Sequence, residues 1–340
     1  MVTAHLVDVV RGPLVESSHR GIVALVDTAG KVHRYLGYPP EITYIRSSAK
    51  PIQVLPLLVL GAAERFELSD RELALMCASH NGEDIHVETA RGILEKAGLT
   101  EEALECGTHL PYDREAAMAL MARGERLSPV YNNCSGKHAG MLLLCQHMGW
   151  ETRGYTRAEH PLQQLMHETI AELADISPDR VEKGIDGCGV VVFGLSVEKM
   201  AFLFARLANP ESLPPSYREA AERVTGAMQT EPYMIAGRNR LCTDLISTTG
   251  GKLIAKSGAE GVYCIGLHDR EQGLAIKIED GNSRGMGAIV YRLLVDLNIL
   301  EEEEEEALEK YRQPVLKNRR GDKVGNIRTR FSFAVSQERV

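Results

Sequence analysis

Strand-like patterns lie at the two ends of this sequence, and helical patterns fill the long stretch between them. Residues 20–37 hold two β-rich runs around a Thr-Ala-Gly turn, which predicts an antiparallel hairpin. Beyond residue 250, three short β-rich segments joined by turns containing Gly and Asp predict an antiparallel meander. If both ends belong to one sheet, the helical middle, about 65–245, is an insertion between its two halves. We therefore expect an α+β fold: a three-layer αβα sandwich with a mainly antiparallel sheet and an added helical region.

The first helix of the chain is expected to be apolar on every side. Residues 52–60 leave no polar face, which is typical of a helix buried all round, and Pro56 predicts a kink in it. Ser69 and Glu72 form a capping box at the start of the next helix, whose C-terminal end should present Ser79. Further helical patterns cover 83–97, 113–123, 136–149, 160–175, 196–208, 215–228, 238–247 and the closing apolar helix at 285–300.

Length, charge and cysteine usage exclude several classes of protein. With 340 residues, one large domain or two packed parts are possible, and we expect a single catalytic domain over 1–340. The net charge is −8 without any Lys/Arg block, which argues against nucleic acid as a partner. We see neither a basic leader with a cleavage site nor an apolar run that spans a bilayer, so we expect a cytoplasmic protein without membrane contact. The seven cysteines lack a framework spacing and suit reduced thiols. The acidic segment at about 301–312 is interpreted as a solvated helix or linker.

Three short motifs carry the candidate chemistry. Ser47 and Lys50 begin the buried helix, Ser79 ends a later helix, and Lys256 lies on a strand of the meander. In chain order they read S-x-x-K, S-x-N and K-S-G, which is similar to the signature of penicillin-recognising serine enzymes. Each motif alone is weak, because a capping serine or a solvated lysine produces the same letters. The three together, in matching structural settings, favour catalysis. Ser47 and Ser79 are nevertheless too close in sequence for the large helical lobe of penicillin-binding enzymes.

Longer segments resemble one family. They are RSSAKPIQ, CASHNGE, NNCSGKHAGML, GIDGCGVVV, AGRNRLCTDLI, AKSGAEGV and KIEDGNSRG, and together they resemble the asparaginase II family of the thermolabile, rhizobial type. The resemblance extends from about His5 to the closing helix. It implies a serine β-lactamase/glutaminase-like fold, a homodimer, and hydrolysis of L-asparagine to L-aspartate and ammonia. It also implies a second Ser-Lys pair at Ser79 and Lys256, no organic cofactor, and one zinc ion per chain bound by Cys134, Lys137 and Cys188.

Amide hydrolysis requires a nucleophile, a base, a proton for the departing ammonia and donors for the oxyanion. We expect Ser47 to be the nucleophile and Lys50 its base. A lysine accepts a proton only when it is neutral, which burial and a second cation such as Lys256 both favour. Ser79 would relay a proton to ammonia. Which serine is acylated stays open, although the unpaired N–H groups of a helix N-terminus favour Ser47. Arg46 is the candidate for the substrate's α-carboxylate.

The NNCSGKHAG block suggests a second cluster. From the residues alone, Cys134 and Cys188 are too far apart in sequence for the paired spacings of structural zinc sites, which favours buried free thiols. Zinc is expected only because of the family resemblance. The remaining candidates are interpreted as substrate contacts or supporting residues, with helix capping and turn formation as the alternative: Asn133, His138 and Asp186.

Two other functions fit the same residues. A penicillin-recognising or D-Ala-peptide serine hydrolase would turn over a β-lactam or be acylated by it. A non-catalytic amino-acid-binding sensor would use the Ser-Lys pair only for recognition, and it would bind asparagine without releasing ammonia.

Overall fold

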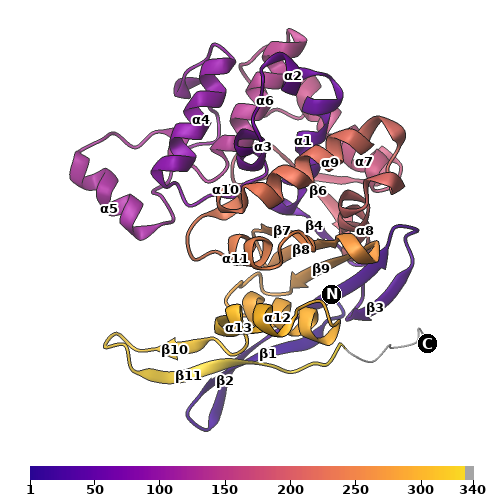
Figure 1. The fold of residues 1–340 in the computed structure, drawn as a ribbon, viewed down its shortest axis with the longest axis vertical. Helices are drawn as coiled ribbons and strands as arrows, with labels where there is room; N and C mark the ends of the chain where they lie inside the picture. Colours follow the sequence, from indigo (N-terminus) through magenta and orange to yellow (C-terminus); the bar gives the residue numbers. More distant parts are fainter. Residues whose placement is uncertain (334–340) are drawn as a thin grey trace.

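One large antiparallel sheet joins the two ends of the chain. The computed structural model describes residues 1–333 (Figure 1). Within them β2 pairs with β9 from Gly21 opposite Ile278 to Asp27 opposite Gln272, so the N-terminal hairpin and the late meander form one sheet, as expected. The strands in spatial order are β10 (Val315–Lys317), β11 (Lys323–Thr329), β1 (Ala4–Arg11), β2 (Leu14–Asp27), β9 (Gln272–Ile278), β8 (Val262–Leu267) and β7 (Leu253–Gly258), with β3 (Val32–Leu36) also paired to β2.

Helices cover both faces of this sheet. Five consecutive residues of β2, 22–26, are buried, which a strand achieves only when both of its faces are covered. The helix α8 (Val197–Ala208) packs on β2, β8 and β9, and α12 (Met286–Asp296) packs against β1 and β11. The approach of α8 is close, because a Cβ added at Gly273 would lie 2.1 Å from the Ala201 carbonyl oxygen. The expected layered α+β architecture is confirmed.

The helical region occupies the upper part of Figure 1, above the sheet. Its first helix, α1, is buried on all sides as expected and continues past Pro56. Ser69 and Glu72 form the predicted capping box. The helices are α1 (Lys50–Val59), α2 (Ala62–Arg65), α3 (Asp70–Met76), α4 (Asp84–Lys96), α5 (Arg114–Arg123), α6 (Ser135–Met148), α7 (Pro161–Leu173), α9 (Pro215–Thr230), α10 (Pro232–Ala236) and α11 (Leu241–Thr248).

A second, three-stranded sheet pairs one strand that precedes the helical part of the chain with two strands inside it. Its order is β4 (Ile42–Tyr44), β6 (Val191–Ser196) and β5 (Glu182–Ile185). Only β6 has a clear sequence pattern, because three- and four-residue strands are too short to show alternation. This sheet positions the candidate site, since the Ile45 amide donates to the Phe193 carbonyl at 3.0 Å directly before Arg46.

The C-terminal part returns to the sheet. The acidic segment contains the helix α13 (Glu302–Ala307), which begins with a Glu301/Glu304 capping box, and a 3₁₀ turn over Glu309–Tyr311. The sequence also has a last strand-like stretch at 327–335, of which only residues 327–329 form the end of β11. Residues 330–333 belong to no strand, and the final two lie outside the described part. Among residues 1–333 no helix combines the length and apolarity that a membrane crossing requires.

Candidate active site

Ser79 lies between two buried lysines. Lys50 Nζ donates to Ser79 Oγ at 3.1 Å, and Lys256 Nζ donates to the same oxygen at 3.0 Å. Lys50 also contacts the Ala78 carbonyl, and Lys256 donates to the Ser257 carbonyl at 2.7 Å. Both lysine side chains are almost fully excluded from water. The structure therefore brings the S-x-x-K, S-x-N and K-S-G motifs together around one hydroxyl.

Three elements deliver these side chains. Lys50 is the first residue of α1, Ser79 follows the end of α3, and Lys256 lies on the edge strand β7. The Ser79 amide donates to the Ile235 carbonyl at 3.0 Å, which holds the segment after α3 in place. The Ser48 hydroxyl donates to the Lys256 carbonyl at 2.9 Å and joins the start of α1 to β7. The Ser79 backbone is thus held against α10, and the two elements that carry the lysines are held against each other.

Ser47 has a different environment. It lies in the 3₁₀ turn Arg46–Ala49 that leads into α1, and it is partly exposed. Within residues 1–333 its hydroxyl has no hydrogen-bond partner, so no hydrogen bond joins it to Lys50 in this structure. Ser47 and Lys50 line the same small cavity of about 10 Å³, roughly the space of one water molecule. The Lys50 amine is directed at Ser79.

Arg46, next to Ser47, is conformationally strained. Its φ of +53° lies in the left-handed region, which is costly for a residue with a Cβ and is often found at functional sites. Its Nε donates to Asp186 Oδ1 at 2.8 Å. Burial opposes ionisation of Asp186, but Lys137 and Arg46 hold the pKa of its carboxyl below the usual value. The small sheet and the loop before β6 thus place a strained arginine and a carboxylate beside Ser47.

A thiol cluster lies on the other side of Lys50. Lys50 Nζ lies 3.2 Å from Cys134 Sγ, and Lys137 Nζ lies 3.1 Å from Cys188 Sγ. A hydrogen bond from Cys134 and the charge of Lys137 lower the pKa of Cys188 to about 5, against the effect of burial. The same hydrogen bond and burial raise the pKa of Cys134 to about 12. Cys188 is therefore a thiolate at neutral pH and faces an ammonium group.

Lys256 has the pKa of a proton-transfer group. Burial lowers its pKa to about 7, and the charges of Lys50 and Arg240 act in the same direction. A lysine with a pKa near neutrality is present in both protonation states at physiological pH, which is the condition for effective general acid–base catalysis. Together with Ser79, Lys256 is equipped to pass protons.

The model of the L-asparaginase II family matches residues 7–329, nearly the whole chain. The chain belongs to the L-asparaginase II family. Membership makes it a hydrolase and agrees with the resemblance of the sequence segments. A search of the curated proteins finds no match.

Solved structures show remote likenesses to this asparaginase II chain. Mglu in its native form is 16% identical, with 84% of this chain and 63% of that chain covered and a TM-score of 0.38. A β-lactamase from Mycobacterium bovis is 13% identical, with 81% and 94% covered and a TM-score of 0.41. The chain thus spans less than two thirds of the length of the Mglu chain. Identities this low say nothing about the substrate.

The three predicted zinc ligands of this asparaginase II chain meet in space. Cys134, Lys137 and Cys188 are each about 4% exposed and lie around one point at the start of α6. In the part of the chain that the structure describes, no group of three or more His, Cys, Asp or Glu side chains is arranged for a metal ion. A metal would therefore need Lys137 as its third protein ligand. Two sulfurs and an amine are a donor set that suits zinc, provided that Lys137 releases its proton.

The two remaining predicted residues, His138 and Asn133, contact other parts of the protein. His138 is fully buried, and its Nδ1 lies 2.6 Å from the Tyr155 hydroxyl. Its second ring nitrogen has no hydrogen-bond partner among the described residues. Asn133 contacts the His109 ring, with its Oδ1 3.2 Å from Nε2. These contacts indicate that His138 and Asn133 hold α6 and the segment before it in place, rather than contact a substrate.

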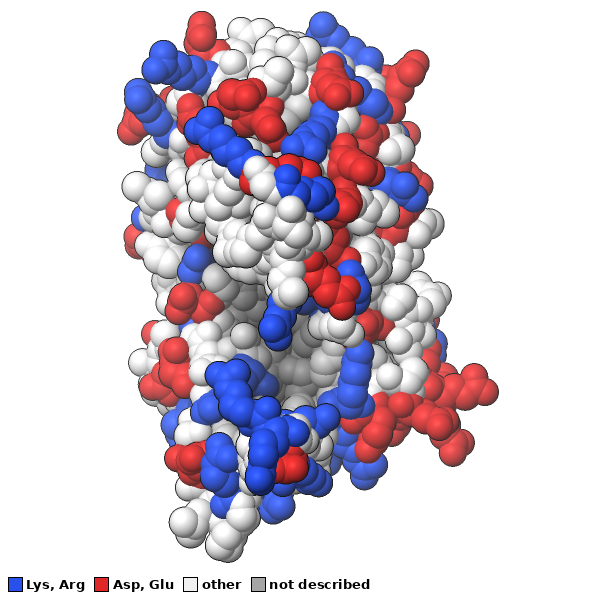
Figure 2. All heavy atoms as spheres, turned by 90° about the vertical axis from the view of Figure 1, so that its left-hand side faces the viewer, with Lys and Arg blue, Asp and Glu red and all other residues white. Residues whose placement is uncertain are grey.

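Sequence reasoning missed Arg240. Its Nη1 donates to Asn81 Oδ1 at 2.7 Å, two residues beyond Ser79, and it faces a pocket on the outer side of β7. The only sequence signal was its place in the segment AGRNRLCTDLI, which does not distinguish it from the neighbouring Arg238. Figure 2 shows a hollow on the side of the molecule that carries α5, with Lys and Arg side chains along its margin.

Proposed function

We propose that the protein is an L-asparaginase that cuts the side-chain amide of L-asparagine to give L-aspartate and ammonia. The observation that carries this proposal is the Ser79 hydroxyl held between two buried lysine amines, at 3.1 and 3.0 Å. A hydroxyl in contact with two amines can take a proton from one side and give it to the other. Family membership supports the amide as the bond that is cut.

In the proposed mechanism the accessible serine attacks and the enclosed serine relays protons. Ser47 Oγ forms a bond to the amide carbon and loses its proton to the Lys50 amine, which lines the same small cavity. The carbon–nitrogen bond then breaks, and the leaving nitrogen takes a proton from Ser79. Lys50 and Lys256 restore the Ser79 proton. Water hydrolyses the resulting ester and releases aspartate.

We assign the α-carbon groups of the substrate to Arg46 and Asp186. The ion pair at 2.8 Å presents a guanidinium for the α-carboxylate and a carboxylate for the α-ammonium group. Because Arg46 directly precedes Ser47, the distance from the bound α-carbon to the Ser47 hydroxyl is fixed. This length favours asparagine over glutamine.

We also propose that Cys134, Lys137 and Cys188 hold one zinc ion per chain. When bound, zinc supplies a fixed cationic centre that replaces the Lys137–Cys188 contact. The protein's own part is to keep Cys188 as a thiolate, which lowers the cost of deprotonation before metal binding. No organic cofactor is needed for the proposed steps.

Two further properties are proposed, the first from the family resemblance and the second from the absence of a leader-like pattern in the sequence. We expect a homodimer, which light scattering of the purified protein would test against a monomer. We expect a cytoplasmic location, which fractionation of the source cells would test.

The experiment that tests the function is ammonia release from asparagine and glutamine, with nitrocefin colour change and penicillin acylation measured in parallel. Turnover of asparagine without reaction of the β-lactams supports the proposal. Hydrolysis of nitrocefin or lasting acylation by penicillin would instead favour a penicillin-recognising hydrolase. Saturable binding of asparagine without ammonia release would identify a sensor.

A further inference from the structure

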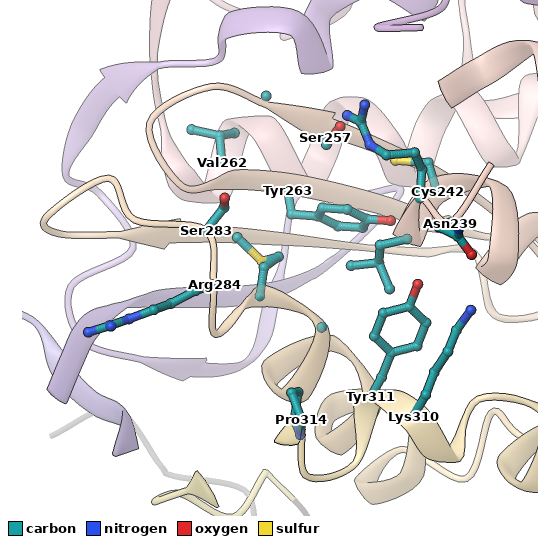
Figure 3. Close-up of a pocket in the computed structure, with 15 residues that line it drawn as sticks. Asn239, Cys242, Ser257, Val262, Tyr263, Ser283, Arg284, Lys310, Tyr311 and Pro314 are labelled. Atoms are coloured by element: carbon teal, nitrogen blue, oxygen red, sulfur yellow. The ribbon is translucent and has the colours of Figure 1, made fainter. Parts of the chain in front are cut away.

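A pocket of about 470 Å³ is lined by Ser257, the residue that follows Lys256 of the proposed proton relay (Figure 3). It lies between α11, the β7–β8 turn and the start of α12. Small-molecule sites commonly occupy about 300–1,000 Å³, so the space is sufficient for a ligand. Asparagine releases only ammonia when its side-chain amide is cut, and ammonia needs almost none of this volume. The pocket is therefore larger than the proposed reaction requires.

Two contacts join the pocket to the proposed active site. Ser257 lines the pocket, and its carbonyl accepts a hydrogen bond from Lys256 Nζ at 2.7 Å. Arg240 also lines it and donates to Asn81 at 2.7 Å, close to Ser79 in the chain. The leaving nitrogen has to lie where Ser79 can protonate it. A substituent on that nitrogen would extend along β7 toward Arg240 and into the pocket.

The lining combines an apolar body with one available cation. The apolar part comes from Leu241, Val262, Met286 and Pro314. Lys310 is already paired with Asp244 at 2.6 Å. Arg284 extends away from the pocket in Figure 3 and donates to His19 at 2.8 Å. Arg240 donates to Asn81 and lies over the Tyr112 ring, but among the described residues it forms no ion pair with a carboxylate, so its charge is available to an anion.

A buried hydroxyl with a weak partner also lies here. Tyr263 is about 1% exposed, and among residues 1–333 its hydroxyl oxygen makes no hydrogen bond of good geometry. Figure 3 shows this hydroxyl on the same side of the pocket as that of Tyr311, which donates to Asp244. The hydroxyl contacts the Cys242 thiol, and sulfur is a weak acceptor. A polar ligand group in the pocket would be a better one.

We propose that the enzyme also hydrolyses β-aspartyl dipeptides whose second residue is apolar. The aspartyl part binds as asparagine does, the apolar side chain fills the pocket, and the terminal carboxylate pairs with Arg240. The chemistry is the same: Ser47 Oγ bonds to the β-carbonyl carbon, the carbon–nitrogen bond breaks, Ser79 protonates the leaving amine, and water releases aspartate. The inference rests on the proposed asparaginase function and names a second substrate class for that site.

The first test compares three substrates of the full-length enzyme. Ammonia release from asparagine is measured beside leucine release from β-aspartyl-leucine and leucinamide release from β-aspartyl-leucinamide, which lacks the carboxylate. We expect kcat/KM for β-aspartyl-leucine within tenfold of that for asparagine, and at least tenfold lower for the leucinamide. Arg240→Gln should bring the ratio of kcat/KM between the two dipeptide substrates close to one, whatever its effect on absolute rates.

Hydrolysis of asparagine without hydrolysis of β-aspartyl-leucine would overturn this inference and leave the proposed function intact. Inertness toward all three substrates would overturn both.

The second test fills the pocket from its rim. Ser283 is exposed, lines the pocket and makes no side-chain hydrogen bond among the described residues, so its replacement leaves the core untouched. Ser283→Trp should reduce kcat/KM for β-aspartyl-leucine at least tenfold and leave that for asparagine unchanged. Ser283→Ala is the matched control and should change neither. An unchanged dipeptide rate in Ser283→Trp, or an equal loss on both substrates, would contradict a leaving-group pocket.

Discussion

Lys256 and Lys137 are both buried lysines near Lys50, and the fold moves their pKa values in opposite directions. Burial lowers the pKa of Lys256 to about 7, and its hydrogen-bond partners are uncharged oxygens. Burial acts in the same sense on Lys137, but Cys188 and Cys134 raise its pKa above the usual value. Burial alone therefore does not decide whether a lysine is charged; the groups that accept its hydrogen bonds decide it.

The difference divides the surroundings of Lys50 into two sides. On one side its amine contacts Ser79 Oγ at 3.1 Å, and on the other it contacts Cys134 Sγ at 3.2 Å. The Ser79 side holds a lysine that can exchange protons near neutral pH. The thiol side holds a thiolate and a cation, which are suited to a metal or an ion pair. Catalysis and metal binding are thus expected to separate on mutation.

The largest expected effect on turnover comes from replacing Ser47, the proposed nucleophile, or Lys50, which lies between the two sides. Ser47→Ala should remove the nucleophile and Lys50→Met its base, each lowering kcat for asparagine by about 10³-fold or more while the fold is retained. Residues that act as a unit are not additive, so the double variant should be little worse than either single one. Ammonia release at saturating asparagine measures this.

Ser48→Ala is the matched control for Ser47→Ala. Its hydroxyl only joins the start of α1 to β7 through the Lys256 carbonyl. We expect a stability loss of about 1 kcal/mol and a much smaller loss of kcat. Near-normal turnover by Ser47→Ala would contradict this assignment. Ser79, which contacts Lys256, would then be the nucleophile.

The next effect concerns substrate length. Glutamine has one more methylene between the groups held by Arg46 and Asp186 and the amide that reacts. A methylene that only fills space is worth roughly 1–3 kcal/mol, but one that displaces the carbonyl from the nucleophile costs more. We expect kcat/KM for glutamine at least about 100-fold below that for asparagine, measured over a wide concentration range. Similar values for the two amides would mean that Arg46 is not the anchor.

The pH profile separates the two lysines directly. In the proposed relay Lys256 gives a proton to Ser79 only when it is charged, and its pKa is lowered to about 7, so kcat/KM should be level below about pH 7. Above that value it should fall about tenfold per pH unit. Lys256→Met should lower kcat by about 10²- to 10⁴-fold and remove the inflection. An unchanged inflection in Lys256→Met would assign it to another group.

The smallest effect on turnover is expected on the thiol side. Cys188→Ala should abolish the zinc content found by elemental analysis, about one ion per chain in the parent protein. It should raise KM more than it lowers kcat, because the proposed proton transfers run through Ser79. It also leaves Lys137 without its thiolate, which should cost about 3–5 kcal/mol of stability in the metal-free protein.

Cys145→Ala is the control for a buried thiol outside the cluster. Burial alone raises the pKa of Cys145, to about 12, and it lies further along α6. Its replacement should preserve zinc. Retention of zinc by Cys188→Ala, or absence of zinc from parent protein purified in zinc-containing buffer, would return Cys134 and Cys188 to free thiols.

Local patterns in the sequence predicted much of the fold. The capping box at Ser69, the all-round apolar α1 and the meander β7–β9 were correct because each depends on neighbouring residues. The strands β4 and β5 were missed because they are too short for a periodic pattern and are stabilised by pairing with β6. Tertiary contact, rather than propensity, determines such short strands.

The site was predicted as a set of residues but not as a geometry. The spacing of Ser47 and Lys50 suggested a direct pair, whereas the Lys50 amine reaches across to Ser79 and Cys134. Sequence spacing describes neighbours within a helix and contains no information about the elements packed against it. Arg240 was missed for the same reason, since only the fold brings it to Asn81.

The pairing of β2 with β9 has a consequence for how the chain acquires its activity. The contact of Gly21 with Ile278 joins segments that the ribosome delivers far apart in time. Pairings between such distant segments are slow to form, because the entropy of closing a long loop is lost before the contacts compensate for it. Until β9 has been synthesised, the apolar residues of β2 lack their central neighbour, and β7 has no completed sheet to join. Lys256 therefore reaches Ser79 only near the end of folding, so a nascent or truncated chain carries the serines and Lys50 in an inactive form.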